Sequence, residues 1–353
     1  MINNEFEKSL FAIDDRYEEF VASMPDINKS NNKNSSDEEP MSVVIKPEIL
    51  DTSALDVGEY SHIYRPINFN EYVGQEQAKK HIQCYLDGCK KFNENFPNTF
   101  ISSPAGCGKT LLANILANKL NKTFVVATAG EIKSEQQLID KIVACKSGIL
   151  FLDEIHRISN KIGTFLLPIL EEYKVCGKRI KPFTMIGAST HRGNLSENLS
   201  ALLQRFPLSI ELESYNQQEI IQILLQFHKK SYSQIPINND LYLKIAKNCK
   251  ATPRIAINLL RESIFTNNWE QVKTQNKIVK NGFTQQDIRA LKFIDDSNGA
   301  SKLSIAKFLR IEPKTYEFEI ETYLINKEMI TVSNKRKITN KGKEFLNQLT
   351  KGE

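Results

Sequence analysis

Residues 102–110, with the sequence SSPAGCGKT, combine glycine, lysine and threonine in a spacing that suits phosphate binding. A P-loop needs backbone N–H groups that converge on phosphates, a lysine that reaches them and a hydroxyl that holds Mg²⁺. The residues that supply these groups are Gly106, Gly108, Lys109 and Thr110. Ser103 replaces the first glycine of the motif, which a serine can do if its φ angle is negative. The loop predicts nucleotide binding, although by itself it leaves a chance match open.

A second motif, GILFLDE at 148–154, places Asp153 and Glu154 at the end of an apolar strand, 44 residues after Lys109. Asp153 can hold Mg²⁺, and Glu154 can orient and deprotonate an attacking water. The alternative is an acidic pair that caps the next helix, which is common for isolated pairs but fits poorly behind a P-loop. Together the two motifs predict hydrolysis of a nucleoside triphosphate.

Apolar runs that alternate with helical patterns must position these two motifs. The runs predict five strands, at 98–103, 123–129, 148–154, 183–189 and 207–213. Helical patterns such as 109–120 lie between them. Strands that alternate with helices indicate an α/β fold with a parallel sheet covered on both faces.

The rest of the chain has a different pattern of predicted helices and strands. Residues 216–285 lack a convincing strand pattern and predict helices. Residues 286–353 predict helices, then two short strands around a polar turn in MITVSNKRKIT, then another helix. We therefore predict four parts: an acidic, largely disordered arm (1–64), the α/β domain (65–214), a small helical domain (215–285) and a C-terminal domain (286–353).

Charge is distributed unevenly along the 353 residues. Residues 1–64 hold 14 Asp and Glu against 5 Lys and Arg, a net charge of −9, and the remainder is +14. A basic body suits a polyanionic partner, although most basic surfaces are simply solvated. The six cysteines form no CxxC pair, which fits a reducing compartment. The acidic start is not a signal peptide, and no apolar run is long enough to span a membrane, so we expect a soluble, cytoplasmic protein.

Six segments in order resemble AAA+ ATPases, and within them the RuvB family of Holliday-junction branch-migration motors. These segments are RPINFNEYVGQE (65–76), SPAGCGKT (103–110), LFLDEIHR (150–157), PFTMIGAST (182–190), QRF (204–206) and ATPRIAINLLR (251–261). The resemblance implies an AAA+ core with a five-stranded parallel sheet between helices, a helical lid domain over 215–285 and a C-terminal winged-helix domain. It also implies ATP as the nucleotide and Mg²⁺ as its metal.

Carried over by position, the resemblance implies the site residues. Arg65, Tyr72 and Val73 would line the adenine pocket. The other nucleotide contacts would be Gly106, Cys107, Gly108, Lys109, Thr110, Leu111, Tyr215 and Arg254, with Thr110 and Asp153 as metal ligands. The catalytic set would be Lys109, Asp153, Glu154, the polar sensor Thr190, the arginine finger Arg205 and the second sensor Arg254. We expect structural or inter-subunit roles for His156 and Arg157.

The predicted wing carries Lys335, Arg336 and Lys337, a cluster that can bind DNA phosphates without reading bases. The alternative is a solvated basic hairpin. The preceding helices are rich in glutamate, at 317, 319 and 321, which argues against direct base readout.

The leading hypothesis is an ATP-driven motor that forms a ring, a hexamer by resemblance, on duplex or four-way-junction DNA. Two alternatives stay open: a clamp-loader-like ATPase that switches a protein–DNA complex, and a scaffold with a degenerate P-loop. Three positions depart from the family pattern: Ser103, Leu111 in place of a usual threonine, and the stretch Lys174–Lys181, which leaves room only for a short hairpin. The family's longer hairpin engages a RuvA-type junction-binding protein, so coupling to such a partner is in doubt.

Overall fold

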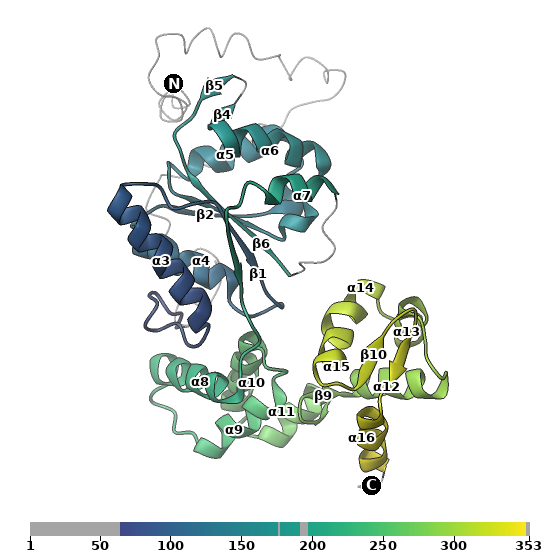
Figure 1. The fold of residues 1–353 in the computed structure, drawn as a ribbon. Helices are drawn as coiled ribbons and strands as arrows, with labels where there is room; N and C mark the ends of the chain where they lie inside the picture. Colours follow the sequence, from purple (N-terminus) through teal and green to yellow (C-terminus); the bar gives the residue numbers. More distant parts are fainter. Residues whose placement is uncertain (1–63, 176, 191–196, 351–353) are drawn as a thin grey trace, which may run out of the picture. The chain divides into compact units, whose positions relative to one another are not determined.

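The computed structural model describes residues 64–175, 177–190 and 197–350. The chain forms two compact units that meet in the sequence between Ser214 and Tyr215, and each has its own hydrophobic core (Figure 1). The acidic arm predicted over 1–64 lies outside the described residues, except for Tyr64.

Five strands of the first unit form one parallel sheet, as the sequence predicts. They are β1 (Thr99–Ser102), β2 (Phe124–Thr128), β3 (Ile149–Asp153), β6 (Thr184–Ser189) and β7 (Leu208–Glu211). Their order across the sheet is β2-β3-β6-β1-β7, and each neighbouring pair is parallel. A separate hairpin of two-residue strands, β4 (Lys174–Val175) and β5 (Lys178–Arg179), follows the helix that ends at Glu172. This hairpin is as short as expected.

Helices cover both faces of the sheet (Figure 1). Two helices, α3 (Glu76–Phe92) and α4 (Lys109–Leu120), pack on the face that carries Ile101 and Phe151. Three more pack on the opposite face: α5 (Glu135–Ala144), α6 (Asn160–Glu172) and α7 (Glu197–Leu203). Successive side chains of a strand point to opposite faces, so these apolar strands contribute to two separate cores.

The strand order determines where a site can form. β1 lies between β6 and β7, whereas the next strand in sequence, β2, lies at the far edge beside β3. At the carboxyl ends, Ser102 pairs with Ser189 and Thr128 pairs with Asp153. In open parallel sheets, ligands bind outside the carboxyl ends where the strand order changes direction. The segments that follow β1, β3 and β6 therefore meet at the carboxyl ends of the strands, which we call the sheet edge.

The second unit begins with four helices: α8 (Gln217–Ser231), α9 (Asn239–Asn248), α10 (Pro253–Thr266) and α11 (Trp269–Gln275). A hairpin of β8 (Ile278–Lys280) and β9 (Phe283–Thr284) follows, so the expectation that 216–285 contains no strand is wrong. Asn281 and Gly282 join the two strands with φ angles of 51° and 83°. Positive φ at both positions is what a two-residue hairpin turn requires, and Asn-Gly is its strongest sequence signal.

The C-terminal part is the predicted winged helix. Its helices are α12 (Gln285–Asp296), α13 (Lys302–Leu309), α14 (Pro313–Thr315), α15 (Thr322–Asn326) and α16 (Asn340–Thr350), and its wing strands are β10 (Ile330–Val332) and β11 (Arg336–Ile338). The helical stretch that begins at Pro313 contains a π-helical turn at Tyr316–Glu321 and ends at Asn326. Tyr316 is fully buried in this turn and belongs to the core of the domain.

A buried ion pair joins the helical and winged-helix parts of the second unit. Lys250, between α9 and α10, places its Nζ 2.8 Å from Oδ2 of Asp287 in α12, whose side chain has no solvent exposure. Asp287 also accepts hydrogen bonds from the N–H and hydroxyl of Thr284, at 2.7 and 2.8 Å, which cap α12. The Lys250 Nζ lies 4.7 Å from the centre of the Tyr323 ring. These contacts tie the loop before α10 to the winged-helix part of the chain.

Candidate nucleotide-binding site

The predicted P-loop connects β1 to α4, and α4 begins at Lys109 directly after Gly108. Gly106 and Gly108 have φ angles of 78° and 94°, which side-chain-bearing residues rarely adopt. A Cβ at Gly108 would also lie 3.1 Å from the Tyr72 hydroxyl oxygen. These glycines turn the chain so that the backbone N–H groups at the start of a twelve-residue helix face the loop, an arrangement that favours anions.

Ser103 is compatible with this loop. It is not among the residues with a positive φ angle, so its side chain brings no backbone strain. Its carbonyl and hydroxyl oxygens both accept hydrogen bonds from the Lys109 Nζ, each at 3.3 Å. Both residues are buried, with 4% and 7% exposure. The serine therefore holds the lysine at the loop and leaves the P-loop conformation intact.

The acidic pair lies where β3 ends. Asp153 is the last residue of the strand, and its Oδ1 accepts a hydrogen bond from the Glu154 N–H at 2.9 Å. Glu154 has a φ angle of 52° and precedes a 3₁₀ turn at Ile155–Arg157. Its side chain makes no capping hydrogen bond with that turn. The Glu154 carboxylate is therefore not engaged in the helix-capping alternative and remains at the edge of the sheet.

Hydrogen bonds and one ion-pair contact connect the acidic pair to the P-loop across the ends of three strands. Ser189, at the end of β6, accepts a hydrogen bond from the Ser103 N–H at 3.2 Å through its carbonyl. The Ser189 Oγ lies 3.1 Å from Nδ1 of His156, whose Nε2 lies 3.2 Å from Oε2 of Glu154. Lys109, Ser103, Ser189, His156 and Glu154 thus form one continuous chain of contacts. Sequence reasoning missed the contact between Ser189 and His156, because Ser189 ends β6 whereas His156 lies in the 3₁₀ turn after β3.

Tyr72 lies under the loop. It is 2% exposed, and its hydroxyl donates to the Cys107 carbonyl at 3.5 Å. Cys107 is itself buried, whereas Val73, Thr110 and Leu111 are half-buried and Arg65 is exposed. Thr190 directly follows β6 and is half-buried. The structure therefore brings Tyr72 and Cys107 together with Gly108, and it puts Thr190 next to Ser189 at the same sheet edge.

Arg205 follows α7 and does not lie in the interior, because 30% of its side chain is exposed. Its guanidinium forms an ion pair with Glu171, near the end of α6. Among the described residues, the buried Nε of Arg205 has no hydrogen-bond partner. Its expected role as an arginine finger for a neighbouring subunit stays a prediction.

Tyr215 and Arg254 belong to the second unit. Tyr215 is 4% exposed and borders a pocket of about 570 Å³, whose other lining residues include Lys247 and Lys327. Arg254 is exposed at the second position of α10. Their expected nucleotide contacts depend on groups of the first unit, so these two roles also stay predictions.

The wing differs from expectation at one residue. Lys335 and Lys337 are exposed, as predicted. The side chain of Arg336 is only 14% exposed, because its guanidinium forms a two-point ion pair with the buried Glu321. Burial of an arginine is stable when a carboxylate satisfies its donors. Arg336 therefore anchors β11 to the π-helical turn and does not stand free at the wing tip.

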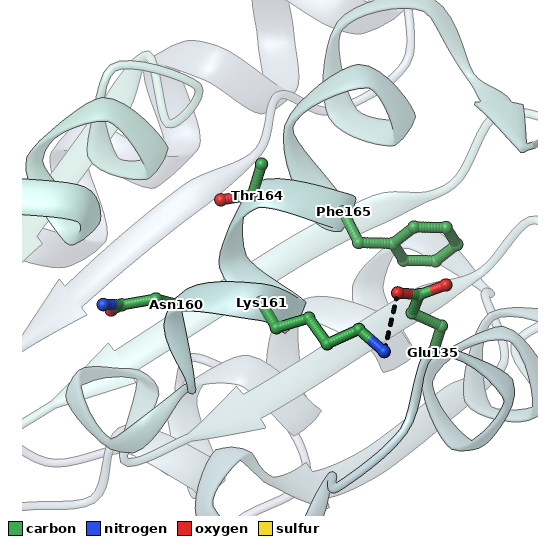
Figure 2. A pocket seen from close by; sticks show the side chains of 5 residues that line it. All are labelled: Glu135, Asn160, Lys161, Thr164 and Phe165. Atoms are coloured by element: carbon green, nitrogen blue, oxygen red, sulfur yellow. Dashed lines mark ion pairs between the residues drawn. The ribbon is translucent and has the colours of Figure 1, made fainter.

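A pocket of about 460 Å³ lies elsewhere on the first unit, between α5 and the start of α6 (Figure 2). Lys161 crosses it and places its Nζ 3.3 Å from Oε1 of Glu135. None of the predicted nucleotide-binding residues lines this pocket. We therefore do not assign it to the nucleotide.

Two negative findings concern the part of the chain that the structure describes. It contains no group of three or more His, Cys, Asp or Glu residues arranged to hold a metal ion. A Mg²⁺ that is held mainly by phosphates and water needs no such group, so this finding leaves the predicted roles of Thr110 and Asp153 as predictions. No described helix combines the length and apolar character needed to cross a membrane.

Comparison with known proteins agrees with this arrangement. Residues 64–212 match the family model of the Holliday junction DNA helicase RuvB P-loop domain, and residues 280–347 match that of the RuvB C-terminal winged helix domain. The RuvB branch-migration subunit of Campylobacter lari is 33% identical over 294 residues, which cover 75% of this chain and 85% of that protein. The corresponding subunit of Mycoplasma genitalium is 28% identical over 302 residues, 80% of this chain and 97% of that protein.

Solved structures agree as well. The Thermotoga maritima RuvB Holliday junction branch migration motor superposes with a TM-score of 0.71 at 28% identity, covering 80% of this chain and 98% of that one. The fold and both domain types are thus those of known relatives, and this chain belongs to the RuvB family.

Proposed function

We propose that this chain is an ATP-hydrolysing DNA motor that drives branch migration of Holliday junctions. Membership of the RuvB family supports the activity, and the curated relatives are named as subunits of a Holliday junction branch migration complex. The observation that carries the proposal is the shared sheet edge, where hydrogen bonds and the contact between His156 and Glu154 link the P-loop lysine to the acidic pair.

At the nucleotide, Lys109 and the N–H groups of the P-loop bind the phosphates of ATP. Thr110 and Asp153 hold Mg²⁺, which when bound supplies positive charge to the phosphate oxygens. Glu154 orients a water molecule and accepts its proton, and Thr190 lies near the γ-phosphate. Lys109 is already held by Ser103, so the lysine is near its working place before ATP binds. Tyr72, packed beneath Gly108, supports the loop from below.

The test of this function compares ATP hydrolysis without DNA, with duplex DNA and with a synthetic four-way junction. We expect DNA to stimulate hydrolysis and ATP to drive strand displacement from the junction. A chain that binds ATP without hydrolysing it would be the scaffold. A chain that hydrolyses ATP but displaces no strand, with or without a RuvA-type protein, would be a switching factor. The two-residue strands of β4 and β5 give us no reason to assign the hairpin as the surface for such a protein.

We further propose that the chain works as a ring, in which Arg205 acts on the ATP bound by its neighbour. A cation that reaches the transferred phosphoryl group stabilises its charge in the transition state. Arg205 is partly exposed, and the carboxylate of Glu171 compensates the charge of its guanidinium. A phosphate of the neighbour's ATP would take the place of that carboxylate. A hexamer is the ring size that the family resemblance implies.

Mixing two inactive variants tests this arrangement. Arg205→Ala and Glu154→Gln should each hydrolyse ATP poorly, for different reasons. In mixed rings, about one quarter of the sites pair an intact Glu154 with a neighbour's intact Arg205, so hydrolysis should rise well above that of either variant alone. The measurement is phosphate release after the two proteins are mixed in equal amounts. Absence of any recovery, with mixed rings confirmed by a size tag, would contradict action in trans.

For DNA, we propose that Lys335 and Lys337 contact phosphates at the wing tip. Each phosphate contact contributes about 0.9 to the slope of log affinity against log salt concentration. Changing both residues to alanine should therefore lower that slope by about 2 and weaken duplex binding equally for any sequence. Fluorescence anisotropy at several salt concentrations measures both. Lys119→Ala, which removes an exposed lysine of α4, is the matched control and should leave the slope nearly unchanged.

A further inference from the structure

The imidazole of His156 lies between two other side chains of the sheet edge. Its Nε2 is 3.2 Å from Oε2 of Glu154, and its Nδ1 is 3.1 Å from Oγ of Ser189. The ring is mostly buried, with 22% exposure, and Ser189 is fully buried. Both ring nitrogens are thus within hydrogen-bond distance of a defined partner: Glu154, directly after β3, and Ser189, at the end of β6.

The partners determine which nitrogen carries the proton. A carboxylate can only accept hydrogen bonds, so a proton on Nε2 suits the 3.2 Å contact with Glu154. In a neutral imidazole the other nitrogen is an acceptor, and we therefore assign the Ser189 hydroxyl as the donor to Nδ1. Ser189 holds the ring on one side so that the ring can hold the carboxylate on the other.

Glu154 has few other restraints on its direction. Its side chain is 27% exposed, and the second cation near Oε2, Arg157, places its Nε 3.6 Å away with 62% of its side chain exposed. That separation exceeds a hydrogen bond, and exposed ion pairs contribute little. The contact with His156 is shorter and less exposed, so it is the stronger restraint on the carboxylate.

Ser189 also belongs to the P-loop side of the site. Its carbonyl accepts from the Ser103 N–H, and Ser103 in turn accepts from Lys109. The next residue, Thr190, is the proposed sensor. A displacement of this end of β6 would therefore reach Glu154 through a single imidazole ring.

We propose that His156 is a positioning residue, which aligns the Glu154 carboxylate for water activation and couples it to the end of β6 through Ser189. The inference rests on the proposed ATP hydrolysis and adds to it a residue that touches neither nucleotide nor water. It gives the 3₁₀ turn after β3 a function beyond local structure.

Three substitutions of His156 separate its two contacts. Glutamine places an amide N–H near the position of Nε2 and keeps a donor for Glu154, whereas asparagine places polar atoms only near Nδ1. Alanine removes both contacts. We expect alanine and asparagine to lower kcat about 10-fold to 100-fold, the loss that follows removal of a hydrogen bond to a charged group. Glutamine should restore most of the activity, and the KM for ATP should stay nearly constant in all three.

Ser189→Ala tests the other end of the same contact. It removes the hydroxyl but keeps the backbone carbonyl that Ser103 uses, so it should lower kcat less than His156→Ala does. The double variant should be no worse than His156→Ala alone, because both changes act through one ring. Nucleotide affinity and thermal unfolding, measured on the same full-length proteins, should match those of the wild type.

The outcomes are distinguishable. Equal losses in the glutamine and alanine variants would overturn the inference, as would a His156→Ala protein with wild-type kcat. Loss of nucleotide affinity or thermal stability in step with kcat would assign His156 a purely structural role and overturn it too. A wild-type chain that hydrolyses no ATP would overturn the proposed function, and this inference with it.

Discussion

Replacing Glu154 by glutamine is expected to lower the rate of ATP hydrolysis by about 10²–10⁴-fold, the usual contribution of a positioned general base. Glutamine has nearly the same shape as glutamate, but its amide cannot accept the proton of the attacking water. The P-loop contacts of Lys109 and Ser103 do not involve this side chain, so ATP should still bind. Phosphate release and nucleotide binding, both measured with saturating Mg²⁺, check the two halves of this expectation.

Glu131→Gln is the matched control. Glu131 is an exposed glutamate of the same unit, in the turn after β2, and the same chemical change there should leave hydrolysis near the wild-type rate. If Glu154→Gln retained the rate of this control, Glu154 would not be the base. The proposal that Asp153 holds the metal while Glu154 activates water would then be wrong.

The second large effect concerns stability. Changing Lys250 to methionine leaves the Asp287 carboxylate without its cation in a site that has no solvent exposure. Breaking a buried ion pair by removing one partner costs about 3–5 kcal/mol of the free energy of unfolding. For a unit of this size, about 2–4 °C per kcal/mol predicts that its thermal unfolding falls by roughly 10 °C. Scanning calorimetry of the full chain measures the shift, and hydrogen exchange at α12 localises it.

Two further variants make this prediction specific. Lys247→Met removes an exposed lysine three residues earlier and should change the unfolding temperature little. The double change Lys250→Met with Asp287→Asn removes both charges, while the asparagine oxygen can still accept from Thr284. It should therefore recover much of the lost stability. Equal unfolding temperatures for Lys250→Met and Lys247→Met would show that the buried pair is unimportant.

Local sequence patterns predicted most of the fold because each strand and helix has a strong periodicity of its own. The five apolar runs became five strands whose ends shifted by only one or two residues. The hairpin of β8 and β9 was missed, because strands of three and two residues leave almost no alternation to detect. The Asn281-Gly282 turn was the available signal, since both residues need positive φ there.

The site was predictable only where its chemistry resides in single motifs. The P-loop and the acidic pair are each a continuous stretch of sequence, so their residue types are enough to identify them. The contact between His156 and Ser189 joins the 3₁₀ turn after β3 to the end of β6 and depends on sheet register. Arg336 illustrates the same limit: its charge suggested a phosphate contact, but its partner Glu321 is supplied by a distant turn. Tertiary pairing of this kind leaves no local pattern.

Lys250 lies four residues before Arg254, so the loop that carries the buried pair with α12 leads directly into α10, the helix with the residue we expect to sense the nucleotide. Because this pair joins α12 to the start of α10 within one compact unit, a movement of α10 would be passed on to the winged helix. Under the proposed function, a change at the phosphates would thereby be transmitted to the DNA.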